Sequence, residues 1–517
     1  MPRSCGSACV GWRAASAALL ALLLIHRPAA AQPTGAAAAT ATAPTAAAPI
    51  NRLPLDVVRA LQRAGLPAAA MGAVVHDATT GQRVLEWQPA RPLNPASLMK
   101  LLTTSAALER LGPAFAWATP VWLAGPVRDG VLEGHLHLQG RGDPAFTADR
   151  VAALLRRLQQ LGVREIRGDI VLDQSAFALP PATAGDFDGE PLRPHNVQPA
   201  ALLFAQRALR YTFTPDAAAG VAQVTVEPAL ATPVLVDRSV PLAPGACNDW
   251  RTALKPQFEI ASTRFGGPGA AGANGTLAHA TYASACGELS WLVADPDPAS
   301  FEARLLQTLW REMGGRLKGR VRAGPPPVPG TVGSTPAFEL RSPPLAEVVR
   351  DINKASNNQM AQQLFLTLAL QARPGEPATP DGARETLLRW LSDRTGPLGD
   401  EVVIENGSGL SRLSRISAQR LAQVLLQAWD GPLMSELMSS LPISGVDGTL
   451  RRARTSTGRA HLKTGSLRDV VALGGYVLSN SGRRYVFVAL VNHELAQGAR
   501  PALDALLQWT LRDAPAF

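Results

Sequence analysis

The 517-residue sequence predicts an α+β fold in which helices pack on an antiparallel sheet and a mainly β insertion interrupts the chain. Three observations support this prediction. Apolar residues recur at helical spacing between residues 345 and 441, and three strand-like runs follow, two of which flank a hairpin signal at residues 480–482. The long middle of the chain is rich in glycine, proline and short β-like runs. The length allows two or three domains.

The individual elements follow from the period of the apolar residues. Helical spacing predicts helices at residues 56–64, 95–112, 151–161, 301–313, 345–370, 382–391, 417–429, 432–441 and 501–511. Short alternating or β-branched runs predict strands at residues 69–76, 84–87, 121–123, 131–138, 166–172, 459–464, 470–478 and 485–492.

The composition indicates a globular protein, with 46% hydrophobic and 18% charged residues. The formal net charge is +9, but the arginines are scattered, without basic runs beyond pairs and without interleaved aromatic residues. We therefore expect no nucleic-acid partner, whereas an anionic envelope polymer fits the charge.

The N-terminus reads as a signal peptide at residues 1–31. Arg3 and Arg13 flank an apolar run at residues 14–25, which is too short to span a bilayer, and Ala29-Ala30-Ala31 offers a cleavage site. An uncleaved anchor fits this pattern less well. We expect export to the periplasm, followed by a flexible linker at residues 32–50. Peripheral membrane association through the final helix is allowed but not predicted.

The predicted export also determines which of the four cysteines can form a disulfide. Cys5 and Cys9 would leave with the signal peptide, so Cys247 and Cys286 remain as an even pair in an oxidising compartment. The sequence therefore predicts a disulfide between them.

Ser97 and Lys100 are the first candidates for chemistry. Asn94 can cap the helix that carries them and Pro95 suits its first position, so the two side chains share a face. Only five of the 50 basic residues are lysines, and a lysine, unlike an arginine, can lose its proton when it is desolvated. Taken alone, the pair also fits an amphipathic helix with one exposed lysine.

Two later motifs complete a set for acyl transfer. These are Ser356-Asn357-Asn358 and Lys463-Thr464-Gly465, and each occurs once. Acyl transfer needs an activated hydroxyl, a proton relay and an oxyanion site. In this set Ser97 is the nucleophile, Lys100 the base and Ser356 the relay to the leaving amine.

The remaining residues of the set would bind substrate. Asn358 would bind a substrate amide and hold Lys100, and Lys463 with Thr464 would bind a substrate carboxylate. Gly465 would let the substrate lie close to the strand edge. The backbone N–H groups of Ser97 and Ser466 would form the oxyanion hole.

These motifs, in this order, are the signature of penicillin-binding proteins and class A β-lactamases. The 259 residues from Ser97 to Ser356 exceed the spacing of a class A β-lactamase. The whole mature chain resembles the penicillin-binding protein 4 type D-alanyl-D-alanine carboxypeptidases/endopeptidases, the class C low-molecular-mass enzymes of peptidase family S13. Further segments carry this resemblance, namely residues 140–144, 194–197, 353–358, 407–411 and 446–450. Glu405-Asn406 departs from it, because the family usually has an aspartate before Gly407.

The resemblance implies a transpeptidase-like (β-lactamase-like) catalytic domain split by a large insertion that carries a nested domain. The expected limits are residues 51–115 and 345–517 for the catalytic domain, 116–143 and 225–344 for the inserted domain, and 144–224 for the nested domain. It also implies a periplasmic serine hydrolase that acts on peptidoglycan stem peptides through an acyl-enzyme on Ser97. We expect β-lactams to acylate Ser97, and we expect no metal and no cofactor.

Several alternatives stay open. A β-lactamase would use the same motifs, although no segment resembles the glutamate loop of class A enzymes, and a non-catalytic cell-wall scaffold or sensor would conserve the fold alone. Ser408 could be a rival nucleophile, but it lacks the Gly-x-Ser-x-Gly pattern and a turn is favoured. His135 and His137 share a strand face, but without a third ligand they indicate surface residues rather than a metal site.

Overall fold

One antiparallel sheet joins the two ends of the folded chain. The computed structural model describes residues 49–230, 238–252, 254, 280–328, 330 and 333–513. The sheet has the strand order β17-β18-β19-β1-β2. Its strands are β1 (Met71–Asp77), β2 (Arg83–Trp87), β17 (Ala460–Leu467), β18 (Val470–Leu478) and β19 (Arg484–Asn492).

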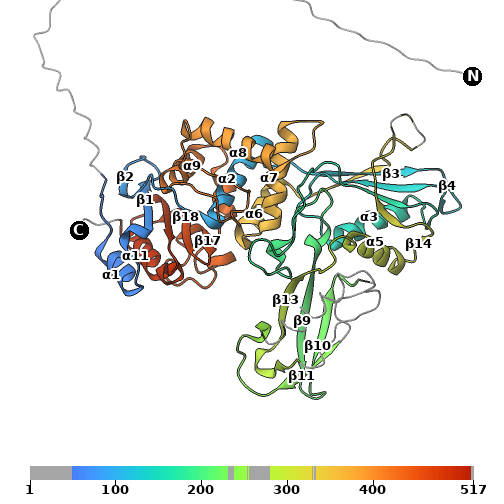
Figure 1. Cartoon of the computed structure of the whole chain (residues 1–517), viewed down its shortest axis with the longest axis horizontal. Coiled ribbons are helices and arrows are strands. Elements are labelled where there is room, and N and C mark those ends of the chain that lie inside the picture. Colours follow the sequence, from blue (N-terminus) through green and yellow to red (C-terminus); the bar gives the residue numbers. More distant parts are fainter. Residues whose placement is uncertain are drawn as a thin grey trace, which may run out of the picture. The chain divides into compact units, whose positions relative to one another are not determined.

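Helices cover both faces of this sheet (Figure 1). On one face α1 (Leu55–Arg63) and α11 (Arg500–Leu511) share an apolar core with the strands. On the other face lies a larger core, to which six further helices of the described part contribute. These are α2 (Met99–Leu111), α6 (Leu345–Ala355), α7 (Asn358–Ala372), α8 (Pro380–Thr395), α9 (Ala418–Asp430) and α10 (Met434–Ser440). The predicted α+β class, with helices on an antiparallel sheet, is confirmed.

The helix expected over residues 345–370 is in fact two helices. α6 ends at Ser356, which has the left-handed angles φ 56° and ψ 40°, and α7 starts at Asn358. Asn357 caps α7, because its side chain accepts a hydrogen bond from the backbone N–H of Met360. The break therefore falls inside the Ser-Asn-Asn motif and turns its side chains out of the helical repeat.

The insertion between α2 and α6 contains three more sheets, with the orders β15-β8-β6-β3-β16, β14-β7-β5-β4 and β12-β11-β10-β9-β13. The helices α3 (Ala148–Gln160) and α5 (Phe301–Glu312) accompany them. The strands are β3 (Ala118–Ala124), β4 (Val127–Arg128), β5 (Val131–Leu132), β6 (His135–Gln139), β7 (Glu165–Ile166), β8 (Ile170–Asp173), β9 (Ala208–Asp216), β10 (Val221–Glu227), β11 (Ser239–Ala243), β12 (Tyr282–Ala283), β13 (Leu289–Ala294), β14 (Arg316–Leu317), β15 (Val321–Ala323) and β16 (Phe338–Arg341).

Two strands expected to be continuous cross from one sheet to another. The run 131–138 divides into β5 and β6, and the run 166–172 divides into β7 and β8. Gly134 and Gly168 lie at the two crossings. A Cβ on Gly134 would come 1.9 Å from the carbonyl oxygen of Ala124, so only glycine fits this close approach.

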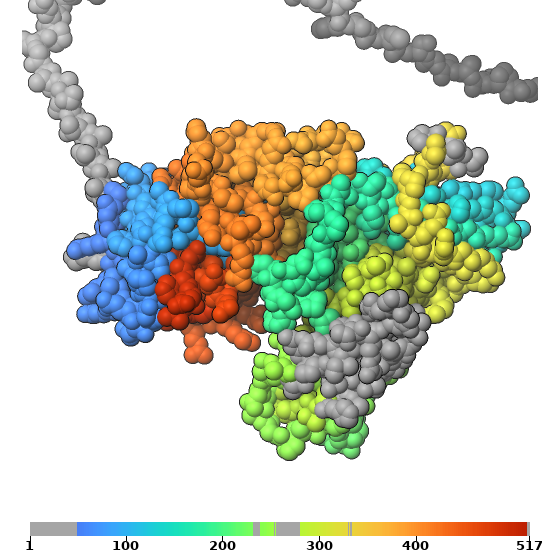
Figure 2. Space-filling view, in the orientation of Figure 1, coloured from blue at the N-terminus to red at the C-terminus, as the bar shows by residue number. Residues whose placement is uncertain are grey.

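The expected limits within the insertion do not follow the strand pairing. The boundary between residues 224 and 225 falls inside β10, which pairs along its length with β9. We propose instead that the nested unit comprises the β9–β13 sheet, at residues 208–294. In the space-filling view the blue-green part of the insertion, which precedes the β9–β13 sheet in the chain, borders the orange helical part of the chain (Figure 2).

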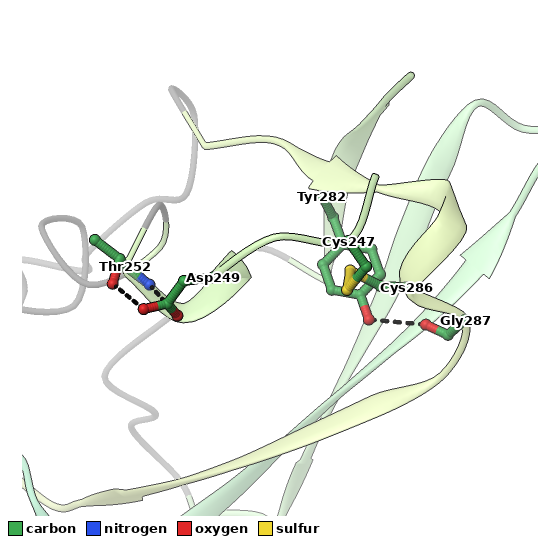
Figure 3. Close-up of a disulfide and its surroundings, with 6 residues drawn as sticks. All are labelled: Cys247, Asp249, Thr252, Tyr282, Cys286 and Gly287. Carbon is green, nitrogen blue, oxygen red and sulfur yellow. Dashed lines mark hydrogen bonds between the residues drawn. A yellow bond between two sulfur atoms is a disulfide. The ribbon is translucent and has the colours of Figure 1, made fainter. Parts of the chain in front are cut away.

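The predicted disulfide is confirmed. Cys247, in the loop after β11, is joined to Cys286, in the turn after β12. The disulfide lies beside Tyr282, whose hydroxyl donates a hydrogen bond to the carbonyl oxygen of Gly287 (Figure 3). The expected signal peptide and nearly all of the expected linker lie outside the described residues. Among the helices of the described part, none combines the length and the apolar character that crossing a membrane requires.

Candidate active site

Ser97 lies in a tight turn just before α2. The turn is a 3-10 helix at Ala96–Leu98, and α2 begins at Met99. Asn94 closes the turn by accepting a hydrogen bond from the backbone N–H of Ala96 at 2.9 Å. Asn94 was predicted to cap the helix, but the residue before the 3-10 turn is Pro95 and the residue before α2 is Leu98, so Asn94 lies outside both caps. Ser97 also precedes the α-helix rather than lying in its first turn. Lys100 follows one turn later, on the same side.

Lys100 is completely buried and its amine has three oxygen neighbours. Nζ lies 2.9 Å from Ser97 Oγ, 2.6 Å from Asn358 Oδ1 and 2.7 Å from the carbonyl oxygen of Ser408. Burial, together with the nearby charge of Lys463, lowers the pKa of Lys100 well below its ordinary value.

These three contacts define the orientation of the amine. The oxygens of Asn358 and Ser408 can only accept hydrogen bonds, so they take both N–H groups of a neutral amine. The third direction, which holds the lone pair, then faces the hydroxyl of Ser97. This is the arrangement that a general base needs in order to take the hydroxyl proton.

Lys463 forms the second half of the site. It is completely buried on β17, and burial lowers its pKa to about 7. Its amine donates hydrogen bonds to Ser356 Oγ at 2.8 Å and to the carbonyl oxygen of Thr464 at 2.9 Å. The break between α6 and α7 turns Ser356 toward β17, so a hydroxyl and a titratable amine meet across two elements.

Gly465 also has a packing role, beside its predicted role at the strand edge. A Cβ at this position would come 2.7 Å from the carbonyl oxygen of Pro95 and 3.1 Å from the side chain of Leu98. The missing side chain therefore lets β17 pack against the turn that carries Ser97. The hydroxyl of Thr464 donates to that of Thr449 at 2.9 Å.

Residues of two predicted motifs line a cavity of about 970 Å³. These are Ser97, Ser356 and Asn358, and they are joined there by Ser466, which directly follows the Lys463-Thr464-Gly465 motif. The volume of this cavity is in the range of small-molecule and peptide sites.

The insertion supplies much of the opposite wall, including Phe187, Asp188 and His195. His195 Nε2 lies 3.0 Å from Asp188 Oδ2, and the guanidinium of Arg412 lies over the ring of Phe187 at 5.0 Å. The segment 194–197 carries part of the family resemblance, but the sequence alone assigns it no role in the site. Nothing in the spacing of these residues shows that they line the same cavity as Ser97.

Ser408 contributes its backbone rather than its hydroxyl. Its side chain is buried and donates to Asn406 Oδ1 at 3.0 Å, which supports a turn rather than a second nucleophile. Asn406 Oδ1 also accepts from the backbone N–H groups of Ser408 and Gly409. An asparagine at this position thus provides the same acceptor oxygen as an aspartate would.

The two candidate metal ligands are bound to the protein itself. His135 Nδ1 accepts a hydrogen bond from the backbone N–H of Asp169 at 2.8 Å, and His137 Nδ1 lies 3.2 Å from the carbonyl oxygen of Pro325. Within the described residues, no three His, Cys, Asp or Glu side chains are grouped as metal ligands.

The sequence and the fold both match known proteins. Residues 55–512 match the D-Ala-D-Ala carboxypeptidase 3 (S13) family. The chain is 28% identical over 451 residues to a D-alanyl-D-alanine carboxypeptidase of Actinomadura sp. (strain R39), and the aligned region covers 84% of this chain and 80% of the relative. It is 25% identical over 439 residues to the D-alanyl-D-alanine carboxypeptidase DacB of Haemophilus influenzae, which covers 82% and 85% of the two chains.

Solved structures show the same fold. The crystal structure of penicillin binding protein 4 (dacB) from Haemophilus influenzae superimposes with a TM-score of 0.68, covering 89% of this chain and 99% of that one at 22% identity. The complex of that protein with a β-lactam gives a TM-score of 0.64 at 21% identity, covering 90% and 100% of the two chains.

Proposed function

The chain belongs to the D-Ala-D-Ala carboxypeptidase 3 (S13) family of serine peptidases, and we propose that Ser97 is the nucleophile with which it cleaves peptides ending in D-Ala-D-Ala. The observation that carries this proposal is the contact between Lys100 Nζ and Ser97 Oγ at 2.9 Å. Because Asn358 and Ser408 occupy the other two directions of the amine, its lone pair faces the hydroxyl.

Acylation would proceed in two steps. Lys100 takes the proton of Ser97 Oγ as the oxygen attacks the peptide carbonyl, and the negative charge moves to the carbonyl oxygen. The backbone N–H groups of Ser97 and Ser466, both at the cavity, are the proposed donors to that oxygen. The C–N bond then breaks, and Ser356 passes a proton to the leaving amine while Lys463 replenishes it.

Deacylation would reverse these roles. Before this step the proton that Lys100 took from Ser97 passes through water in the cavity to Lys463, so that Lys100 is neutral and Lys463 is charged again. A water molecule then attacks the acyl carbon, Lys100 takes a proton from it, and that proton passes to Ser97 Oγ as the ester bond breaks. The product is a free carboxylate, and the enzyme regains its starting state. All groups that these steps require belong to the chain, so the reaction as proposed uses no cofactor.

Substrate binding would depend on charge at the β17 edge. Protonated Lys463, together with Thr464, suits the terminal carboxylate of a D-alanyl-D-alanine peptide, and Asn358 suits its amide. Peptidoglycan stem peptides and their cross-links carry these groups. β-Lactams also present a carboxylate beside a reactive amide, and the Haemophilus influenzae relative has been crystallised with a β-lactam. We therefore propose peptidase, endopeptidase and β-lactam-binding activity at one site.

The proposed location is the periplasm. The disulfide between Cys247 and Cys286 suits an oxidising compartment, and residues 1–31 have the pattern of a signal peptide. The cleavage site can be tested by N-terminal sequencing of the protein recovered from a periplasmic extract.

Intact mass spectrometry after incubation with benzylpenicillin tests the assignment of Ser97. The wild-type protein should gain the mass of one benzylpenicillin molecule, and Ser97→Ala should not. Ser439→Ala, which changes an exposed serine on α10, is the matched control and should keep the adduct. An adduct that survives in Ser97→Ala would contradict the proposal. Release of D-alanine from a muropeptide separates a peptidase from a scaffold, and fast nitrocefin turnover would instead favour a β-lactamase.

A further inference from the structure

A left-handed turn in the insertion lies beside the active site. Ala205, Gln206 and Arg207 have φ angles of 45°, 54° and 46°, although none of them is glycine. The left-handed conformation is unfavourable for residues with a Cβ atom, so three in succession persist only where the surroundings hold them.

The insertion itself holds both ends of this turn. Before it, Phe204 is buried against the ring of Phe146 at 4.6 Å, and the backbone N–H of Ala205 donates to the carbonyl oxygen of Phe146 at 2.8 Å. After it, Arg207 Nε donates to the buried carboxylate of Glu302 at 2.7 Å. The turn is therefore fixed by contacts that lie away from the catalytic motifs.

Gln206 projects from this turn to the start of α7. Its Oε1 accepts a hydrogen bond from Asn357 Nδ2 at 3.0 Å, and its backbone carbonyl oxygen accepts one from Gln359 Nε2 at 3.0 Å. Asn357 and Gln359 are the two neighbours of Asn358, whose Oδ1 takes a hydrogen bond from Lys100 Nζ at 2.6 Å. Gln206 of the insertion thus binds the residues on both sides of Asn358, which orients the amine of Lys100.

A second contact holds the next turn of α7. The side-chain amide of Gln363 accepts from the backbone N–H of Ala200 at 3.1 Å and donates to the carbonyl oxygen of Ala200 at 2.8 Å. Gln359 and Gln363 are four residues apart and so share a face of the helix. That face is attached to the insertion at two points.

We propose that Gln206 is a positioning residue of the active site, through which the inserted segment fixes Asn358 and thereby the amine of Lys100. This inference rests on the proposed function, because it assigns a purpose to the orientation of Lys100. The insertion would then take a direct part in acylation, in addition to forming part of the cavity wall. Without the Gln206 contact, Asn358 would take up several orientations and the lone pair of Lys100 would face Ser97 for less of the time.

The dependence of benzylpenicillin acylation on antibiotic concentration tests this proposal, because it separates the acylation rate constant from the dissociation constant of the non-covalent complex. Gln206→Met, which keeps the length but loses the acceptor, should lower the rate constant about tenfold, a loss typical of one buried hydrogen bond. The dissociation constant should change less than threefold. Gln206→Gly, which adopts the left-handed turn without strain, should show the same loss and covers the case in which the methionine variant does not fold.

A double-mutant cycle with Asn357→Ser, which keeps a capping oxygen at the start of α7 but loses the amide that donates to Gln206, distinguishes positioning from a general loss of structure. If Gln206 acts through Asn357, the double variant loses about tenfold, as each single variant does, rather than about a hundredfold. Gln159→Met is the matched control, since Gln159 also donates one side-chain hydrogen bond within the insertion, to the carbonyl oxygen of Met313 at 2.8 Å. It should acylate within twofold of the wild type.

Two outcomes would overturn the inference: wild-type rates in both Gln206 variants, or a multiplied loss in the double variant. Failure of the proposed function is a separate result, because the wild-type protein itself would then form no adduct on Ser97.

Discussion

Lys463 Nζ donates a hydrogen bond to Ser356 Oγ at 2.8 Å, across 107 residues of sequence. The contact links the break between α6 and α7 to the strand β17. A buried amine with a pKa of about 7 can both hold a substrate carboxylate and feed protons to the hydroxyl beside it. The two lysines of the site consequently need opposite protonation states, neutral for Lys100 and charged for Lys463.

This requirement predicts a bell-shaped pH profile for the second-order rate constant of acylation, which reports on the free enzyme. The acidic limb arises because Lys100 must lose its proton, and the alkaline limb arises because Lys463 loses its charge as the pH rises through about 7. Arginine keeps its charge throughout this range. Lys463→Arg should therefore lose the alkaline limb near pH 7, whatever its maximal rate. A limb that stays at the same pH in this variant would show that another group titrates there.

Replacing Lys463 by glutamine should move the acidic limb. The charge of Lys463 is one cause of the low pKa of Lys100, so its removal raises that pKa. Because a higher pKa means that Lys100 stays protonated to higher pH, the acidic limb should shift upward in Lys463→Gln. Stopped-flow acylation by benzylpenicillin between pH 5 and pH 8 measures this shift. A downward shift would contradict the repulsion between the two amines.

Asn358→Ala should lower the acylation rate about 10- to 100-fold, the range expected when a hydrogen bond to an ionisable group is lost. Lys100 would lose the acceptor that now lies 2.6 Å from its amine, and its lone pair would no longer be directed at Ser97. Asn480→Ala in the exposed hairpin between β18 and β19 is the control. The side chain of Asn480 is exposed, and its backbone N–H, which the substitution keeps, donates a hydrogen bond to the carbonyl oxygen of Leu511. Equal rates in the wild type and Asn358→Ala would remove Asn358 from the mechanism.

The side chains of the site could be predicted from the sequence because acyl transfer requires particular residue types. Ser97, Lys100 and Lys463 were found in this way, and the structure brings them together. The carbonyl oxygen of Ser408 could not be found, since every residue has one and only the fold decides which carbonyl reaches Lys100. Gln206 could not be predicted for a related reason, because a left-handed turn without glycine has no sequence pattern that indicates it.

The fold was predicted best where the local pattern and the tertiary packing agree. The strands β18 and β19 are continuous apolar runs that are buried on both faces, and the helix α9 has apolar residues at helical spacing along its buried face. The break at Ser356 was missed, since the apolar spacing continues across it and no glycine or proline marks it. The crossing at Gly134 was missed because pairing with a distant strand, rather than local preference, decides where a strand changes sheet.

Gly409→Ala should displace the nucleophile. Gly409 has a φ of 75°, and a Cβ there would come 1.8 Å from the carbonyl oxygen of Ala96, next to Ser97. The loop at Gly409 or the turn at Ala96–Leu98 must move, so we expect a lower melting temperature together with a loss of acylation. Gly482→Ala is a matched control, because Gly482 has a φ of 94° but open space around it. This variant should have a free energy of unfolding lower by about 1 kcal/mol, through backbone strain alone, and should acylate at the wild-type rate. Normal acylation by a folded Gly409→Ala would show that the turn tolerates the shift.

Removing the disulfide should affect the insertion and spare the chemistry. Cys247 and Cys286 close a loop with a sequence separation of 39 residues. The double change Cys247→Ser and Cys286→Ser should destabilise the β9–β13 sheet by about 2–4 kcal/mol. Limited proteolysis should then cut within this sheet earlier than in the wild type, while Ser97 still acylates. Loss of acylation in the intact double variant would indicate that the sheet supports the site directly.

The pairing of β1 with β19 places Met71 opposite Val491, so the first strand of the sheet closes on the last. A growing polypeptide that has reached α10 already contains Ser97 and Ser356 but not the strand that carries Lys463. Neither the sheet nor the pair of amines can form until residues 460–492 have followed. The chain therefore stays inert throughout its synthesis, and its ability to cut a wall polymer begins only when its final strands are in place.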